Sequence, residues 1–66
     1  MKNTIKIQRA FKDLTQEALA NKIGVSRQTI NSIENNRYIP STVLALKISK
    51  VFDISVNEIF ELENED

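Results

Sequence analysis

The stretch QEALANKIGVSRQTINSIE, residues 16–34, decides the fold, because its small and apolar residues recur at the spacing of two short helices joined by a tight turn. Ala20 is small enough for a second helix to cross close to the first, and Gly24 can adopt the left-handed conformation that ends a helix. The aliphatic positions that hold the two helices together are Leu19, Ile23, Val25, Ile30 and Ile33. The pattern predicts a helix-turn-helix over about residues 16–35, with the outer face of its second helix prominent.

Capping residues fix where these two helices begin. Thr15 and Ser26 precede the two apolar runs, and their hydroxyls suit the N-cap position. Leu14 and Leu19 flank the Thr15 cap at the spacing of a hydrophobic staple. We therefore expect the two helices to span about residues 16–23 and 27–35.

Three further helices are expected outside this motif. Before it, one apolar stripe is predicted on a helix of about residues 5–13, formed by Ile7, Ala10, Phe11 and Leu14. After a loop at NNRYIP, Ser41 caps a helix whose predicted inner face consists of Leu44, Ala45, Ile48, Val51 and Phe52. Ser55 and Glu58 then form a capping box, and Ile54 and Ile59 a second staple. The final ELENED is expected to be frayed.

Composition and length limit the fold and the chemistry. The 66 residues, with one Gly and one Pro, predict a single all-α domain of five short helices over residues 1–66. The absence of Cys and His removes disulfides, zinc fingers, thiolate nucleophiles and the usual general base, so we expect neither an enzyme nor a metal or cofactor site. No apolar run reaches the roughly 18 residues that cross a membrane. We expect a cytoplasmic protein that does not enter membranes.

The zero net charge hides an uneven distribution of charge along the chain. Residues 1–50 carry nine Lys and Arg against three acids, whereas residues 51–66 carry six acids and no base. A basic body fits a polyanionic partner contacted by that body alone. A solvated body with an acidic, solubilising tail explains the charges equally well.

Polar side chains cluster on the outer side of the second helix of the motif. With Ser26 as the cap, Arg27, Gln28, Asn31 and Ser32 lie outside while Ile30 and Ile33 lie inside. In the major groove Arg can form two hydrogen bonds with the edge of guanine, and Gln can form two with the edge of adenine. An ordinary solvated helix face is the alternative, but together with the steric pattern these four residues are predicted to read bases of double-stranded DNA.

The chain resembles the Xre/Cro/C1-type helix-turn-helix regulators, which include the lambdoid phage repressors. The matching residues are LTQEALANKIGVSRQTINSIENNRYIPS followed by LALKISKVFDISVNEIF, so the resemblance covers about residues 5–60. It implies a five-helix, lambda-repressor-like domain with short strand-like ends, and a homodimeric transcription regulator that most often represses. The short length without an effector domain is also similar to compact members of this family.

The resemblance implies further contacts with the DNA backbone. It assigns Gln16 to a phosphate at the start of its helix, and Ser26 and Thr29 to nearby phosphates. It places Asn35, Arg37 and Tyr38 in a loop that grips the backbone across the groove, although Arg37 could instead be a free surface charge.

The same resemblance implies one structural pair and shows two departures. It makes Arg9 and Glu34 an ion pair that joins the first helix to the end of the third. Asn36 stands where many members have Gly, and Asn is the next best residue for a left-handed turn. Ser32 is shorter than the amide of some members, so its base readout is expected to be weak or through water.

Apolar residues near the C-terminus predict a dimer. Val56, Ile59, Phe60 and Leu62 exceed what one helix on a small core needs, so the interface is expected within about residues 54–63. The alternative is that these residues close the core of the chain itself. An antitoxin whose acidic tail binds a toxin, or another protein-interaction module, is the competing function.

Overall fold

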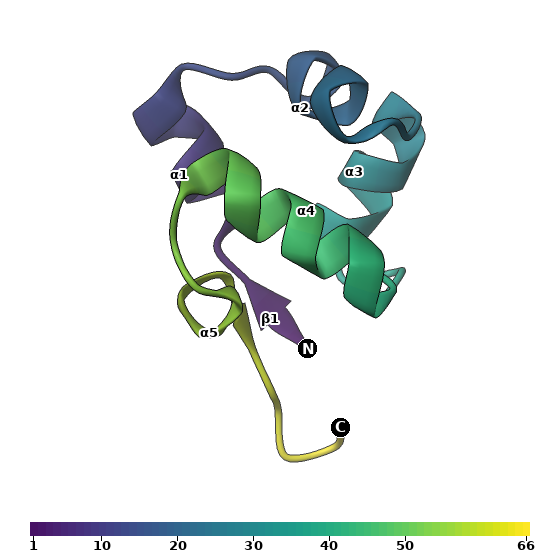
Figure 1. Ribbon diagram of the computed structural model, residues 1–66. Helices are drawn as coiled ribbons and strands as arrows, with labels where there is room; N and C mark the ends of the chain where they lie inside the picture. The colour runs from purple at the N-terminus through teal and green to yellow at the C-terminus, as the bar shows by residue number, and fades with distance from the viewer.

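The computed structural model describes residues 1–66 and contains five helices and a pair of two-residue strands (Figure 1). In chain order the elements are β1 (Lys2–Asn3), α1 (Ile5–Lys12), α2 (Gln16–Ile23), α3 (Arg27–Glu34), α4 (Thr42–Phe52), α5 (Val56–Ile59) and β2 (Phe60–Glu61). The predicted all-α class with short terminal strands is confirmed. Each predicted helix is present, and the bounds of α2 and α3 differ from the expected ones by at most one residue.

Side-chain caps begin three of the helices where the sequence predicts them. The Thr15 hydroxyl accepts the Ala18 N–H at 3.0 Å, Ser26 accepts the Thr29 N–H at 3.2 Å, and Ser41 accepts the Leu44 N–H at 3.1 Å. At α5 the Glu58 carboxylate accepts the Ser55 N–H at 3.1 Å, which is the return bond of the predicted capping box. These bonds satisfy N–H groups that have no partner inside a helix.

Left-handed backbone ends α2 and follows α3. Gly24 has φ 75° and its N–H bonds to the Ala20 carbonyl, as expected for the residue that makes the tight turn. Asn36 has φ 61°, so Asn adopts the left-handed turn where Gly is common in the family that the sequence resembles. The α2–α3 turn therefore depends on Gly24, since side chains at this φ are strained.

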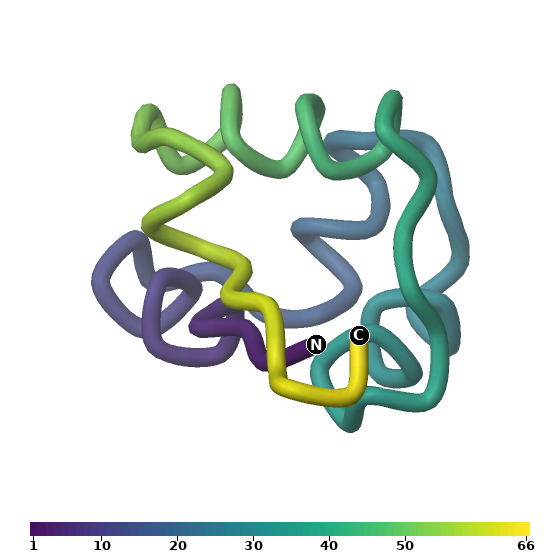
Figure 2. Tube along the Cα trace, turned by 90° about the horizontal axis from the view of Figure 1, so that it is seen from below, coloured from purple at the N-terminus to yellow at the C-terminus, as the bar shows by residue number.

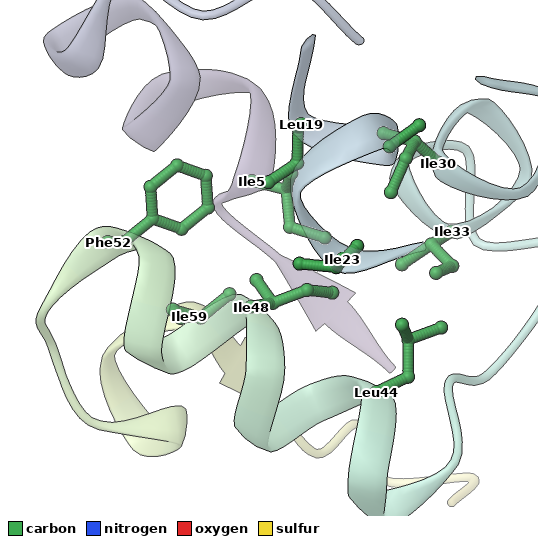
Figure 3. Packing of buried hydrophobic residues seen from close by; sticks show 10 residues of the cluster. Ile5, Leu19, Ile23, Ile30, Ile33, Leu44, Ile48, Phe52 and Ile59 are labelled. Atoms are coloured by element: carbon green, nitrogen blue, oxygen red, sulfur yellow. The ribbon is translucent and has the colours of Figure 1, made fainter. Parts of the chain in front are cut away.

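All five helices contribute to one small apolar core, in which α4 faces α2 and α3 (Figure 3). The core consists of Ile5, Leu19, Ala20, Ile23, Ile30, Ile33, Leu44, Ile48, Phe52 and Ile59. Every α2 and α3 aliphatic of the motif belongs to this core, and Val25 of the turn packs against it. The buried face of α3 is therefore fixed, which leaves its opposite face to solvent.

The predicted inner face of α1 is wrong for three of its four residues, and only Leu14, which follows the helix, packs against the core. Ile7 is 55% exposed, Phe11 is 78% exposed and Ala10 is also exposed, while Ile5 is fully buried. Ile5 and Arg9 lie four residues apart and share the inward face, because Ile5 enters the core and Arg9 reaches Glu34. That orientation turns Ile7 and Phe11 to the opposite side.

The two ends of the chain lie side by side (Figure 2). Lys2 pairs with Glu61 and Asn3 with Phe60 in an antiparallel ladder, so the predicted frayed end is wrong at Glu61. The ammonium group of Met1 lies 3.0 Å from carboxylate oxygens of both Glu63 and Asp66. Hydrogen bonds to Glu63 and Asp66 raise the pKa of this amine, and a backbone hydrogen bond from Glu63 lowers the pKa of Asp66.

The longest helix, α4, has 11 residues. No helix of the chain combines the length and apolar character needed to cross a membrane.

Removing a core side chain should destabilise the fold far more than removing an exposed aliphatic one. Ile48 is fully buried, and we expect Ile48→Ala to lower the free energy of unfolding by about 2–5 kcal/mol. The matched control Ile7→Ala, at a 55% exposed position, should change it by less than about 0.5 kcal/mol. Urea unfolding at one protein concentration, followed by circular dichroism, measures both. Similar losses for the two variants would contradict this description of the core.

Candidate nucleic-acid interface

Helix α3 separates an apolar face from a polar one. Ile30 and Ile33 are buried against the rest of the chain, whereas Arg27 and Gln28 are exposed in the first turn of the helix. Neither of these two side chains is held by a hydrogen bond or ion pair to another part of the protein. Asn31 and Ser32 lie on the same outer side, one turn further along, and are partly exposed. The structure thus brings the four residues predicted to read bases onto one face.

The first turn of α3 is also tied together by its own hydroxyl groups. The hydroxyls of Ser26 and Thr29 are 3.0 Å apart, in addition to the cap bond between the Ser26 side chain and the Thr29 N–H. Tyr38, which is 46% exposed, lines a shallow hollow together with Gln28, Thr29 and Ser32. The predicted phosphate-contacting residues Thr29 and Tyr38 therefore flank the predicted base-reading residues.

The loop after α3 is anchored by its backbone and by the N-terminal strand. The Asn36 N–H bonds to the Ile33 carbonyl at 3.0 Å, and the Arg37 N–H to the Ser32 carbonyl at 2.8 Å. The Asn3 amide donates to the Ile33 carbonyl at 2.9 Å and to the Asn36 side-chain oxygen at 3.3 Å. No local pattern indicates this role of Asn3, because its two partners lie 30 and 33 positions away in the sequence. Arg37 itself is exposed and forms no ion pair.

Arg9 and Glu34 form a two-bond ion pair between α1 and the end of α3. Arg9 Nε lies 2.7 Å from Glu34 Oε2, and Arg9 Nη2 lies 3.1 Å from Glu34 Oε1. Arg9 Nη1 also donates to the Leu14 carbonyl at 2.9 Å, and the two side chains are only 14% and 6% exposed. The pair thus joins α1, the turn before α2 and the end of α3.

Side-chain amides extend this pair across the flank of α3. Gln16 Nε2 donates to Glu34 Oε1 at 3.1 Å and to Asn31 Oδ1 at 3.3 Å. Asn35 Nδ2 donates to the backbone oxygen of Asn31 at 2.9 Å and to its Oδ1 at 3.1 Å. The amide nitrogens of Gln16 and Asn35, both predicted to contact phosphates, are therefore directed at protein groups in this structure. Backbone N–H groups in the first turn of α2 remain suited to an anion.

The sequence-based prediction missed one basic residue that lies beside the flank of α3 formed by Gln16, Asn31 and Asn35. Lys6 lines a polar hollow together with Gln16, Asn31 and Asn35. Its position on α1, outside the motif, gave no reason to place it near α3. The only carboxylate that lines this hollow belongs to Glu34, which Arg9 neutralises, so the flank of α3 is favourable to a negatively charged ligand.

The prediction that Ile59 lies in a dimer interface is wrong. Ile59 is 1% exposed and packs in the core of its own chain, beside Ile48 in Figure 3. The second staple explains this burial, since the residue four places after the Ser55 cap turns inward against the core. Val56 and Phe60 are partly buried, and Leu62 is 76% exposed.

An apolar hollow of about 630 Å³ lies next to the remaining predicted interface residues. Val56, Phe60 and Leu62 line it together with Ile39 and Leu46, which are 63% and 55% exposed. The sequence-based prediction missed Ile39 and Leu46. Leu46 is an apolar residue of α4 that lies outside the predicted inner face of this helix. Its apolar character at an outward position could have indicated a second apolar surface.

Helix α3 is capped in its first turn, exposes one face to solvent and packs on α2, to which a turn at Gly24 joins it. This arrangement defines a helix-turn-helix protein. Residues 5–59 match the family model described as Helix-turn-helix. The chain belongs to this family of DNA-binding transcription regulators, of the Xre/Cro/C1 type, which are not enzymes. The resemblance drawn from the sequence is confirmed.

Relatives with similar sequences occur in archaea and bacteria. The chain is 52% identical to the uncharacterised HTH-type transcriptional regulator MJ0272 of Methanocaldococcus jannaschii, over the whole of both chains. It is 46% identical to the uncharacterised HTH-type transcriptional regulator YgzD of Bacillus subtilis, over 98% of each chain. These matches extend over the terminal strands as well as the helices.

Two solved structures share the fold. The restriction-modification controller protein C.AhdI from Aeromonas hydrophila is 32% identical, with a TM-score of 0.77 over 85% of each chain. The P22 c2 repressor, solved in complex with a synthetic operator, is 28% identical, with a TM-score of 0.76 over 80% of each chain. The predicted lambda-repressor-like fold is thereby confirmed.

Breaking the Arg9–Glu34 pair should destabilise the domain. Arg9→Met leaves the mostly buried Glu34 carboxylate without its cation, and we expect a loss of about 3 kcal/mol in the free energy of unfolding. Arg27→Met, at an exposed arginine without a protein partner, should change it by less than about 0.5 kcal/mol. Adding Glu34→Leu to Arg9→Met should recover part of the loss, since no buried charge remains. Chemical unfolding measures the stability of all three variants. Equal stability of Arg9→Met and Arg27→Met would contradict a structural role for the Arg9–Glu34 pair.

Proposed function

We propose that this protein is a transcriptional repressor that binds an inverted-repeat operator in double-stranded DNA as a homodimer. The observation that carries the proposal is the pair Arg27 and Gln28, exposed and free of protein partners in the first turn of α3. A recognition helix enters the roughly 12 Å wide major groove with its N-terminal residues against base edges. The cap at Ser26 and the core beneath α3 hold these side chains in position.

Base readout rests on side chains of different reach. Arg27 is suited to guanine, to which it can donate two hydrogen bonds, and Gln28 to adenine, which it can both donate to and accept from. Ser32 lies one turn further along and is short, so its contact is weaker or passes through water. Asn31 completes the set at the flank of the helix.

Contacts with the DNA backbone supply affinity and fix the orientation of α3. Arg37 is exposed and unpaired in the loop after α3, and Tyr38 lies beside Thr29 and Ser32. Gln16 and Asn35 both reach Asn31 on one flank of α3, so they lie toward the same DNA backbone. Ser26, Thr29 and the loop at Arg37 and Tyr38 supply the other backbone contacts. Phosphate contacts of this kind carry no sequence information, but they position the residues that do.

The apolar hollow supports a homodimer. Two recognition helices must stand about 34 Å apart to enter successive major grooves of one DNA face, and a two-fold pair supplies that spacing. Val56, Phe60 and Leu62, together with Ile39 and Leu46, present an apolar surface that a second copy can cover. The two-fold axis of such a dimer makes the operator an inverted repeat.

Repression follows from occupancy. A dimer bound across a promoter excludes polymerase, and the chain has the fold of a repressor solved on an operator. We place this activity in the cytoplasm, together with the DNA.

Two arginines should affect DNA binding in different ways. After operator selection from a random duplex pool, Arg27→Ala should cost about 1–3 kcal/mol on the operator and relax the preference at one base pair. Arg37→Ala should weaken binding to operator and random DNA alike and reduce the slope of log affinity against log salt by about one. Titrations of labelled duplexes at several salt concentrations measure both effects. Equal losses on operator and random DNA for Arg27→Ala would remove Arg27 from the base-reading set.

The apolar hollow should determine the oligomeric state. At micromolar concentration, sedimentation should show a species of twice the 7.6 kDa of one chain, and Leu46→Glu should convert it to the monomer. Phe11→Glu is the matched control, since Phe11 is an even more exposed apolar residue on α1 and does not line the hollow. A monomeric wild type would refute the dimer, and dissociation caused equally by both variants would refute this interface.

A further inference from the structure

The side-chain amide of Asn31 is held in one orientation. Its oxygen accepts a hydrogen bond from Gln16 Nε2 at 3.3 Å and another from Asn35 Nδ2 at 3.1 Å. These donors come from the start of α2 and from the residue that ends α3, so the amide of Asn31 is fixed from two sides. No comparable bond holds Arg27 or Gln28 on the same face.

Residues with a single hydrogen-bonding role dictate this orientation. Gln16 Nε2 also lies 3.1 Å from the Glu34 carboxylate, which only accepts while it is paired with Arg9, so Gln16 must present its NH₂ group. Asn35 Nδ2 lies 2.9 Å from the backbone oxygen of Asn31, which also only accepts. The Asn31 atom that both neighbours approach must therefore be its oxygen. The direction of the hydrogen bonds that run through Glu34 and Gln16 is set by the Arg9 guanidinium, which can only donate.

The amide nitrogen of Asn31 is left for a ligand. An amide oxygen has two lone pairs, and the protein uses both. The nitrogen donates to no group of the protein, and Asn31 lines the polar hollow of about 380 Å³ that Lys6 also lines. Pairing of an asparagine with adenine through two bonds requires the asparagine oxygen to accept from N6 while its nitrogen donates to N7. That mode of recognition is closed to Asn31.

We propose that Asn31 contacts DNA only as a hydrogen-bond donor, and therefore binds only groups that accept. These groups are purine N7, guanine O6, thymine O4 and phosphate oxygens, and the amino groups of adenine and cytosine are excluded. The inference rests on the proposed function, because it specifies which chemical groups of the operator this residue of α3 recognises. It also distinguishes Asn31 from Gln28, whose oxygen is free to accept.

Duplexes that lack one functional group at a time test this proposal. Wild type and Asn31→Ala are titrated against the selected operator and against versions of it modified at single positions. Acceptors are removed with 7-deazapurines, 2-aminopurine for guanine, 5-methyl-2-pyrimidinone for thymine, and methylphosphonates. Donors are removed with purine for adenine and 2-pyrimidinone for cytosine. The comparison of the two proteins on each duplex forms a double-mutant cycle that cancels indirect effects of the modification.

We expect Asn31→Ala to lose roughly 2- to 10-fold in affinity on the unmodified operator, as for one hydrogen bond. This loss should disappear on a duplex that lacks one acceptor, and the position of that acceptor separates a base edge from a phosphate. Disappearance on a duplex that lacks an adenine or cytosine amino group would overturn the proposal. So would an unchanged affinity of Asn31→Ala for the unmodified operator.

Asn31→Asp provides a second variant that preserves the network. Its carboxylate has the shape of the amide and can accept the bonds from Gln16 and Asn35, but it cannot donate. We expect it to melt no lower than Asn31→Ala and to lose at least as much affinity for the operator. Operator binding by Asn31→Asp at wild-type strength would overturn the proposal.

Failure of the inference and failure of the proposed function give different results. If the wild type binds no duplex at low salt, the proposed function and this inference are both refuted. Suppose that the wild type binds the operator and that Arg27 contributes to its sequence preference, but that the effect of Asn31→Ala disappears on a duplex that lacks an adenine or cytosine amino group. This inference alone is then refuted.

Discussion

Burial of Ile30 and Ile33 between α2 and α4 is the constraint on which the rest of the structure depends. The two side chains are almost fully excluded from solvent, and Ala20 is small enough for α3 to cross closely over α2. A helix with a period of 3.6 residues that buries these two positions must turn positions 27, 28, 31 and 32 outward. The same packing that stabilises the domain therefore also orients the residues proposed to contact bases.

Much of the fold could be predicted from the sequence, because its signals are local. The caps at Thr15, Ser26 and Ser41 and the lone Gly24 act within a few residues, so α2, α3 and the start of α4 were predictable. The inner face of α1 was not, because two faces of an eight-residue helix compete and a distant residue, Glu34, decides between them. Apolar periodicity alone favoured the face that carries Phe11, which is in fact exposed.

The candidate site was predictable in its residue types and less so in its connections. Arg27 and Gln28 follow from their place after the cap, and the structure leaves them exposed. The bonds of Gln16 and Asn35 to Asn31 join helices whose relative placement no short pattern encodes. Ile59 illustrates the same limit. From the sequence alone, an apolar residue near the end of a chain can belong either to the core or to an interface, and only the packed structure shows that Ile59 is in the core.

The freedom of Arg27 and Gln28 from the rest of the protein has a consequence for evolution. Because neither side chain holds another part of the chain in place, either can be exchanged with little effect on folding. Descendants of one ancestral gene can therefore acquire new target sequences by one or two changes in this turn, each passing through a folded intermediate. Duplicated copies of such a gene can separate their targets quickly, whereas changes at Asn31 would also disturb the bonds that connect α2 with the end of α3.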